Sequence, residues 1–251
     1  MTSLIRLFIN KNLNLGGQVE IEKGRLHYLK NVMRLEVGSK FLLFNGQAGE
    51  VLGRIVEIGK NKMLVDIENQ IRVQSFDSDI WLLFSPIKRT CINFVAEKAT
   101  ELGASRLLPV ITDYTNNNRV NIDRLNNIAI EAAEQCHRLT IPDITPPKEL
   151  TEVLEKWDPA RRLLVMDETL AIKDGLTTEA IRMSTLRVKK NKKPCDAILI
   201  GPEGGFSPSE LDKFGELGFV QKITLGRRLL RAETAATVAL GLWNELIGIR
   251  N

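Results

Sequence analysis

Two stretches near the C-terminal end of the chain place glycine between an apolar run and the start of a helix. In residues 197–205 the apolar run AILI leads into the turn GPEGG, and in residues 219–226 a second strand-like run ends at Gly226. Glycine tolerates positive φ angles and lets a ligand approach bare backbone amides and carbonyls. A single GxxGG turn is more often an ordinary strand-to-helix connection. The pair of turns favours a shared ligand site.

Helix signals follow both turns. After the first, Ser207 can cap the helix, Pro208 suits its first position because proline lacks an N–H, and Glu210 can close a capping box. After the second, residues 227–235 lead into an apolar helix that we expect to end near Ile247. The order strand, glycine turn and helix therefore occurs twice.

Upstream of these turns the alternation of strands and helices continues. Apolar runs predict strands at residues 80–84, 106–111 and 162–168, and apolar residues at helical spacing predict a helix over residues 92–102. Strands that alternate with helices form a parallel sheet covered on both faces, and ligands bind at the carboxyl ends of its strands. The predicted fold class of this part is therefore α/β.

The start of the chain follows a different pattern. Short β-branched or apolar runs are separated by turn residues, at residues 4–9, 40–44, 50–58 and 63–68. They predict a compact antiparallel β-barrel. Residues 25–35, between its first strands, show helical spacing with a basic side. A polar stretch at residues 71–79 marks the linker, so we predict two domains, residues 1–72 and residues 73–251.

Composition excludes several classes of protein. With 43% hydrophobic and 26% charged residues, the chain is typical of soluble globular proteins. The apolar run at residues 4–9 is too short for a signal peptide or a membrane span, so we expect a cytoplasmic protein with no membrane contact. The three cysteines are far apart and only two histidines are present, so we expect no metal site.

Positive charge is concentrated at the start of the chain. Residues 1–75 hold 11 Lys and Arg against 7 Asp and Glu, which accounts for the whole net charge of +4. Phosphates attract such a surface without regard to base sequence, so a small basic domain suits a nucleic-acid partner. The basic run at residues 187–194 is explained more simply as a solvated loop than as a further RNA contact.

The glycine turns also carry a family resemblance. Residues 200–207, IGPEGGFS, together with Leu225-Gly226 and the run LRAETA at residues 230–235, resemble the signature of the RsmE family, a branch of the SPOUT methyltransferases. Residues 97–104 and 128–138 are similar to the family as well. The resemblance implies a C-terminal trefoil-knot domain with a mostly parallel sheet, an N-terminal PUA-like RNA-binding β-barrel, and a homodimer. It further implies that S-adenosyl-L-methionine binds in the knot and that N3 of a specific uridine in the 16S rRNA of the small ribosomal subunit is methylated.

By the same resemblance, the glycine turns and the end of the preceding strand supply the cofactor-binding residues. The predicted set is Met166, Asp167, Ile200, Gly201, Pro202, Glu203, Gly204, Gly205, Leu225, Gly226, Leu230, Arg231, Glu233, Thr234 and Ala235. The carboxylates of Asp167 and Glu168, which end a predicted strand, are either neighbours of the ligand or caps of the next turn.

Two charged residues are candidates for catalysis. Methylation at N3 of uridine requires that the N3 proton leaves, and the resulting anion spreads onto the ring oxygens, where a fixed donor stabilises it. Arg231 is assigned to that task or to orienting the nucleotide, and Glu203 to ordering the turn or handling a proton. N3 lies on the Watson–Crick edge, so the base must be unpaired or turned out of a helix.

The resemblance also assigns seven residues to rRNA contact: Arg6, Arg25, His27, Lys30, Arg34, Gln135 and Arg138. For each charged side chain among them, a solvated surface position is about as good an explanation. Arg138 could simply offset the dipole at the end of a helix. In the loop of residues 112–119, Tyr114 stands where the family usually has an arginine, and Arg119 could compensate. No catalytic role is therefore assigned to this loop.

Other functions are less well supported by the motifs. The glycines do not spell GxGxxG in an opening βαβ unit, which disfavours a dinucleotide oxidoreductase. No GxxxxGK[ST] motif occurs, which disfavours a P-loop enzyme. A non-catalytic rRNA-binding or ribosome-assembly protein with a methyltransferase-like fold remains the alternative. Failure to bind S-adenosyl-L-methionine would favour it.

Overall fold

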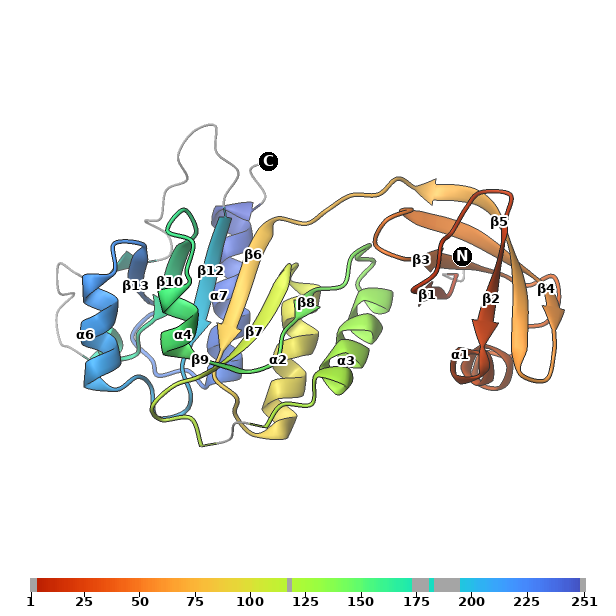
Figure 1. Ribbon diagram of the computed structural model, residues 1–251. Coiled ribbons are helices and arrows are strands. Elements are labelled where there is room, and N and C mark those ends of the chain that lie inside the picture. Colours follow the sequence, from red (N-terminus) through yellow and green to blue (C-terminus); the bar gives the residue numbers. More distant parts are fainter. Residues whose placement is uncertain (1–3, 117–118, 173–180, 183–194, 249–251) are drawn as a thin grey trace. The chain divides into compact units, whose positions relative to one another are not determined.

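The computed structural model describes residues 4–116, 119–172, 181–182 and 195–248. The chain divides into two compact units (Figure 1). The N-terminal unit contains Met1–Phe76 and Ala133–Ile141, and the C-terminal unit contains Asp77–Ala132 and Pro142–Asn251. The basic run at residues 187–194 lies outside the described residues.

The N-terminal unit is built on one curled sheet. Its strands are β1 (Arg6–Phe8), β2 (Gln18–Glu22), β3 (Lys40–Phe44), β4 (Glu50–Ile58) and β5 (Lys62–Arg72), in the order β1-β3-β4-β5-β2. All neighbours are antiparallel except β1 and β3. Bulges between β4 and β5 bend the sheet, and alternate side chains such as Phe41, Leu43 and Val65 fill its inner side. The predicted small N-terminal β-domain is confirmed.

The helix predicted over residues 25–35 is shorter and less regular than expected. Helix α1 (Lys23–His27) continues directly into a π-helical turn, η1 (Tyr28–Val32), after which Arg34 adopts a positive φ of 55°. Gly24 lowers the helix propensity of the first turn. Leu26 and Leu29 are the buried anchors of this segment, so packing holds it in place more than propensity does.

Arg6 lies buried on β1, an edge strand of the N-terminal sheet. Its side chain is 2% exposed and forms an ion pair with Glu50, whose side chain is 3% exposed. The guanidinium also donates to the main-chain carbonyls of Ala133, Glu134 and Arg138, at 2.6, 3.0 and 2.8 Å. Carbonyls at a helix end lack intrahelical partners. Arg6 supplies those partners at the end of α3 (Ile122–Gln135), which explains why residues so distant in sequence belong to this unit.

A second arginine completes this cluster. Arg72 donates twice to Glu50, at 2.9 and 3.0 Å, and once to the carbonyl of His137, at 2.9 Å. Burial alone would raise the pKa of Glu50. The hydrogen bonds and charges of Arg72 and Arg6 outweigh that effect and hold the pKa below its ordinary value of 4.5.

This cluster corrects two assignments to RNA contact. Arg6 is buried and its guanidinium is committed to groups of its own unit. Arg138 is only 7% exposed, and its Nε donates to the hydroxyl of Thr140 at 3.0 Å. Both arginines therefore stabilise the fold.

The C-terminal unit is an α/β domain, as predicted. Its strands are β6 (Asp79–Phe84), β7 (Arg106–Ile111), β8 (Asp143–Ile144), β10 (Arg162–Met166), β11 (Ile181–Arg182), β12 (Cys195–Ile200) and β13 (Val220–Thr224). They lie in the order β11-β13-β10-β12-β6-β7-β8, and the described pairs are all parallel. The short β9 (Lys148–Glu149) also pairs with β7. The predicted fold class is confirmed.

Helices cover both faces of this sheet (Figure 1). On one face, α4 (Leu150–Glu155) and α6 (Pro208–Glu216) pack against strand residues such as Val165 and Leu199. On the other, α7 (Ala232–Leu246) contacts β12 and α2 (Arg89–Glu101), and the indole of Trp243 donates to Asp196 at 2.7 Å. The central strands are thus buried on both faces, which is why they read as continuous apolar runs.

Strands that follow one another in sequence are separated in this part of the sheet. After β10 the chain enters α5 (Thr169–Ile172), which contacts β13, and β11 lies beyond β13. After β13 the chain continues to α7, which contacts β12 on the other side of β10. The order β11-β13-β10-β12 therefore brings the carboxyl ends of β10, β12 and β13 together.

Candidate functional site

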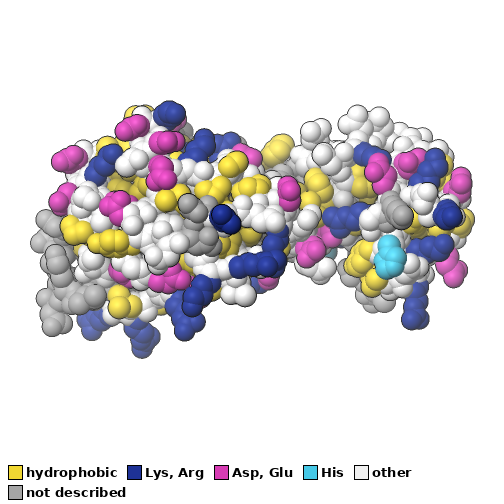
Figure 2. Space-filling model, turned by 60° about the horizontal axis from the view of Figure 1, so that its bottom comes forward, with side chains coloured by type: hydrophobic (Ala, Val, Ile, Leu, Met, Phe, Trp, Pro, Cys, Tyr) yellow, Lys and Arg dark blue, Asp and Glu magenta, His cyan; other side chains and the backbone are white. Residues whose placement is uncertain are grey.

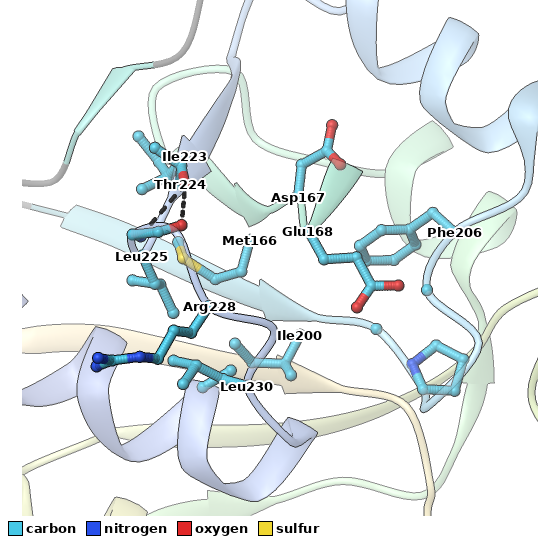
Figure 3. Close-up of a pocket in the computed structure, with 15 residues that line it drawn as sticks. Met166, Asp167, Glu168, Ile200, Phe206, Ile223, Thr224, Leu225, Arg228 and Leu230 are labelled. Atoms are coloured by element: carbon cyan, nitrogen blue, oxygen red, sulfur yellow. Dashed lines mark hydrogen bonds between the residues drawn. The ribbon is translucent and has the colours of Figure 1, made fainter. Parts of the chain in front are cut away.

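Three neighbouring strands, β10, β12 and β13, end level with one another. Met166 pairs with Ile200 on one side and with Ile223 on the other. Beyond these ends lies a pocket with about 520 Å³ of empty space, partly open to solvent (Figure 3). It is lined by Met166, Asp167, Glu168, Ile200, Gly201, Pro202, Gly205, Phe206, Ile223, Thr224, Leu225, Gly226, Arg228, Leu230 and Ala235. Both glycine turns therefore lie at one pocket.

The first turn needs glycine at two positions for different reasons. Gly205 has a φ of +69° and donates its N–H to the carbonyl of Pro202 at 3.0 Å. A Cβ at Gly205 would lie 2.5 Å from Oε1 of Glu168, so a side chain here would displace that carboxylate. A Cβ at Gly201 would lie 3.1 Å from the ring of Phe206. The absence of a side chain at both positions therefore leaves Glu168 and Phe206 in their places on the pocket wall.

The helix after this turn starts as predicted. Ser207 and Glu210 form a complete capping box, and Pro208 occupies the first turn of α6. The hydroxyl of Ser207 also donates to the carboxylate of Asp113, whose N–H donates to Glu210 at 3.1 Å. Tyr114 packs against Gly204. The loop that follows β7 is therefore fixed to the GPEGG turn.

Thr224 closes the second turn through hydrogen bonds to Gly226. The hydroxyl of Thr224 accepts from the N–H of Gly226 at 3.3 Å and donates to its carbonyl at 3.2 Å, and Gly226 has a φ of +123°. Helix α7 then begins after Arg231, which makes no side-chain capping bond. Leu230 and Ala235 line the pocket on either side of this helix start. A helix N-terminus favours negatively charged groups.

The two carboxylates after β10 have different environments. Asp167 is buried and accepts from the N–H and the hydroxyl of Thr169, at 2.9 and 2.7 Å, so it caps the next turn. Glu168 lines the pocket, and its carboxylate lies beside Phe206 (Figure 3). Burial and the charge of Asp167 raise the pKa of Glu168 above its ordinary value. Glu168 therefore holds a proton more readily than an ordinary glutamate.

Most of the residues assigned to the cofactor from sequence lie on the pocket wall. They are Met166, Asp167, Ile200, Gly201, Pro202, Gly205, Leu225, Gly226, Leu230 and Ala235. The others belong to the same turns without lining the pocket: Glu203, Gly204, Arg231, Glu233 and Thr234. The side chains of Glu203 and Arg231, the two catalytic candidates, are exposed.

Five lining residues are missing from the predicted set: Glu168, Phe206, Ile223, Thr224 and Arg228. Glu168 was recognised only as a neighbour. Phe206 follows GPEGG directly, so a signal for it existed. Ile223 and Thr224 reach the pocket because β13 pairs in register with β10, which the sequence does not reveal. Nor does it reveal which arginine of residues 227–231 faces the pocket.

The remaining residues assigned to RNA lie in the N-terminal unit. His27, Lys30 and Arg34 are exposed on the α1–η1 segment. Arg25 is half-buried and pairs with Glu134 at 3.1 Å. Gln135 is exposed at the end of α3. RNA contact stays a prediction for all five residues. Arg25 is the most restricted of them, because it is half-buried and paired with Glu134.

In the part of the chain that the structure describes, no helix is both long enough and apolar enough to cross a membrane. No group of three or more His, Cys, Asp or Glu could hold a metal ion in the same residues.

Two family models match the sequence. A model described as an RNA methyltransferase domain matches residues 74–244, and one described as an RNA methyltransferase PUA domain matches residues 21–68. The curated "Ribosomal RNA small subunit methyltransferase E" of Rickettsia conorii is 34% identical over 237 residues, which is 94% of this chain and 93% of that protein. The protein of the same name from Synechocystis is 29% identical over 96% of this chain and 78% of its own length.

Solved structures are similar over nearly the whole chain. A ribosomal RNA small subunit methyltransferase E from Neisseria gonorrhoeae bound to S-adenosyl methionine superposes with a TM-score of 0.86 at 25% identity, covering 99% of this chain and all of that one. A methyltransferase from Legionella pneumophila in complex with the same cofactor gives 0.84 at 26% identity, covering 97% and 98%. The likeness therefore extends over both units.

Proposed function

Because the chain belongs to the RsmE family of RNA methyltransferases, we propose that it transfers the methyl group of S-adenosyl-L-methionine to N3 of one uridine in the 16S rRNA of the small ribosomal subunit. The observation that carries the proposal is the pocket at the ends of β10, β12 and β13, where both glycine turns of the family signature lie. Relatives named as small-subunit rRNA methyltransferases and similar structures that contain the cofactor support it.

The lining of the pocket suits this cofactor. Apolar side chains such as Met166, Ile200 and Leu230 suit a flat purine ring, and the bare peptide groups of the two turns suit its polar edge. The carboxylate of Glu168 suits a positively charged group of the ligand. When bound, S-adenosyl-L-methionine supplies a methyl group on a positively charged sulfur. The residues of the chain then hold the reacting nitrogen in line with that methyl group.

Arg231 and Glu203 are assigned to the substrate side of the reaction. Both are exposed and both belong to the turns that build the pocket, so their side chains can reach a base held at its mouth. Arg231 stabilises the negative charge that spreads onto the ring oxygens when the N3 proton leaves. Glu203 orders the turn or accepts that proton.

We assign the two predicted domains different tasks. Residues 1–72 hold the surrounding rRNA, for which the exposed side chains of His27, Lys30 and Arg34 and the PUA family match are the support. Residues 73–251 bind the cofactor and carry out the transfer. A homodimer, a cytoplasmic location and a reaction without a metal ion complete the proposal, and all three rest on the family.

The test is a methyl-transfer assay with the purified protein, labelled S-adenosyl-L-methionine, and small ribosomal subunits or 16S rRNA from cells that lack the protein. Nuclease digestion and mass spectrometry should find N3-methyluridine at one position. Calorimetry measures cofactor binding separately. Cofactor binding with no methylation of either substrate would contradict the proposed reaction. No cofactor binding at all would favour the non-catalytic rRNA-binding or assembly role.

A further inference from the structure

The C-terminal unit has a second cleft, which is separate from the pocket described above. It lies between the first turn of α2 and the segment that leads into α3, and it holds about 750 Å³ of empty space that includes its open mouth. Its lining residues are Arg89, Ile92, Asn93, Arg119, Val120, Asn121, Arg124 and Leu125. We call it the arginine cleft.

The lining of the arginine cleft is cationic. It contains three arginines from two segments of the chain, and the lining residues that the structure describes include no carboxylate. Arg89 and Arg119 are exposed and Arg124 is half-buried. A cluster of guanidinium groups with amide side chains between them suits an anion, and planar guanidinium groups match phosphate oxygens in particular.

Two hydrogen bonds hold part of the arginine cleft in a fixed conformation before a ligand binds. Nε of Arg124 donates to Oδ1 of Asn93 at 3.1 Å, which sets the direction of the guanidinium group. The main-chain N–H of Arg124 donates to the side chain of Asn121 at 2.9 Å, which caps the start of α3. A preformed donor loses less entropy on binding than a mobile one.

The start of α2 carries charges of the wrong sign for a helix. Its N-cap is Lys88, which makes no side-chain capping bond, and its first residue is Arg89. The first turn contains no acidic residue. The N-terminus of a helix is electropositive, so cations there are unfavourable and an anion is favourable. This arrangement costs stability in the free protein and becomes favourable when an anion binds.

The arginine cleft lies on the same edge of the sheet as the cofactor pocket. Helix α2 follows the carboxyl end of β6, the strand next to β12, and Arg119 follows the carboxyl end of β7. The loop after β7 is bonded to the GPEGG turn through Asp113 and Ser207. Figure 2, which turns the lower edge of Figure 1 toward the viewer, shows Lys and Arg side chains on this side of the C-terminal unit.

We propose that the arginine cleft binds a backbone phosphate of the substrate RNA beside the target nucleotide. The proposal rests on the function proposed above and adds a contact made by the catalytic unit itself. A phosphate contact fixes the position of the strand and carries no base specificity. The cleft would therefore set where the target base enters the neighbouring pocket, while the N-terminal unit holds other parts of the RNA.

The experiment compares the double variant Arg89→Gln/Arg119→Gln with the wild type and with Lys156→Gln. Lys156 is an exposed cation that precedes β10, at the opposite edge of the sheet. Affinity for small ribosomal subunits and for free 16S rRNA is measured over a range of salt concentrations. The double variant should bind RNA about tenfold more weakly, and the slope of log affinity against log salt should fall by roughly 1, the value for one lost phosphate contact.

Further measurements separate this proposal from the one it rests on. Cofactor affinity by calorimetry should stay at the wild-type value, and Arg89→Lys/Arg119→Lys, which keeps the charges, should recover most of the RNA affinity. If the double variant matches Lys156→Gln in affinity and slope, the cleft makes no phosphate contact with the RNA. If inorganic phosphate stabilises the wild type and not the variant while RNA binding is equal, the cleft binds small anions and its assignment to RNA is wrong. RNA binding is measured without methyl transfer, so an inactive wild type would contradict only the proposed function.

Discussion

Two pairs of arginines, one pair in each unit, have opposite roles. In the N-terminal unit, Arg6 and Arg72 enclose Glu50 and donate to main-chain carbonyls, and Arg6 is almost completely buried. In the C-terminal unit, Arg228 is exposed and lines the pocket, and Arg231 is exposed in the same turn. A guanidinium group whose donors are filled by the protein stabilises the fold, and one that faces a cavity is available to a ligand. Removal of an arginine from the first pair should therefore reduce stability, and removal of one from the second pair should reduce function.

The largest expected effect is that of Arg6→Ala. The substitution leaves Glu50 buried beside only one arginine and leaves the carbonyls of Ala133 and Arg138 without their donor. Breaking a buried ion pair in this way costs about 3–5 kcal/mol. Urea denaturation followed by circular dichroism should report this loss. Below the unfolding transition, cofactor affinity should be unchanged, because the pocket lies within the other unit.

Arg231→Ala is the matched control for that experiment and the second prediction. Its stability should stay within about 0.5 kcal/mol of the wild type, because the side chain is exposed and makes no capping bond. The rate of methyl transfer at saturating RNA should fall by about 10²- to 10³-fold, the usual effect of removing one donor from a developing oxyanion. Full activity with normal RNA binding would remove Arg231 from the mechanism. A loss of stability like that of Arg6→Ala would end the contrast between the units.

The sequence predicts those features that depend on neighbours along the chain. The capping box of Ser207 and Glu210, the apolar central strands and the glycine turns are all local patterns, and the structure contains each of them. The RsmE signature adds the expectation of a trefoil knot, which periodicity alone would never suggest. The cofactor set from residues 200–235 is local in the same sense, which is why so much of it lies on one pocket wall.

Features that depend on distant partners are not predictable in this way. Arg6 and Arg34 are both basic residues of a basic domain, yet Arg6 is buried and Arg34 is exposed. What separates them is that Arg6 meets the end of α3, more than 120 residues later, as its bonds to residues 127 to 132 positions away show. Ile223 is a similar case, since the register of β13 against β10 brings it to the pocket.

Glu168→Gln extends the comparison from arginines to carboxylates and should have a smaller effect. The burial and the neighbouring Asp167 that raise the pKa of Glu168 disfavour its charged form in the folded protein. Loss of the charge should weaken binding of S-adenosyl-L-methionine by about tenfold, the value of one hydrogen bond to a charged group.

Glu168→Gln should weaken cofactor binding but increase the stability of the folded protein. A carboxyl group with a raised folded pKa binds its proton more tightly in the folded state, so stability falls as pH rises from the unfolded pKa to the folded one. The variant should lack this decline and be slightly more stable than the wild type at neutral pH. Calorimetry and denaturation on the same samples test both points, and an unchanged cofactor affinity would exclude Glu168 from the binding site.

The contribution of Glu50 to stability should depend on pH in the opposite direction to that of Glu168. Per pH unit, this is the smallest of the expected effects. Its folded pKa lies below the ordinary value because Arg72 and Arg6 favour the charged form despite burial. Such a group contributes stability above its unfolded pKa, and that contribution is lost as pH falls through the lowered folded pKa. One proton is involved, so the slope cannot exceed about 1.4 kcal/mol per pH unit.

The difference in unfolding free energy between wild type and Glu50→Gln should therefore be constant near neutral pH and shrink in acid. A difference that stays constant down to the acid limit of folding would mean that the charge of Glu50 is not what holds the two arginines, and the contrast between the units would then rest on packing alone.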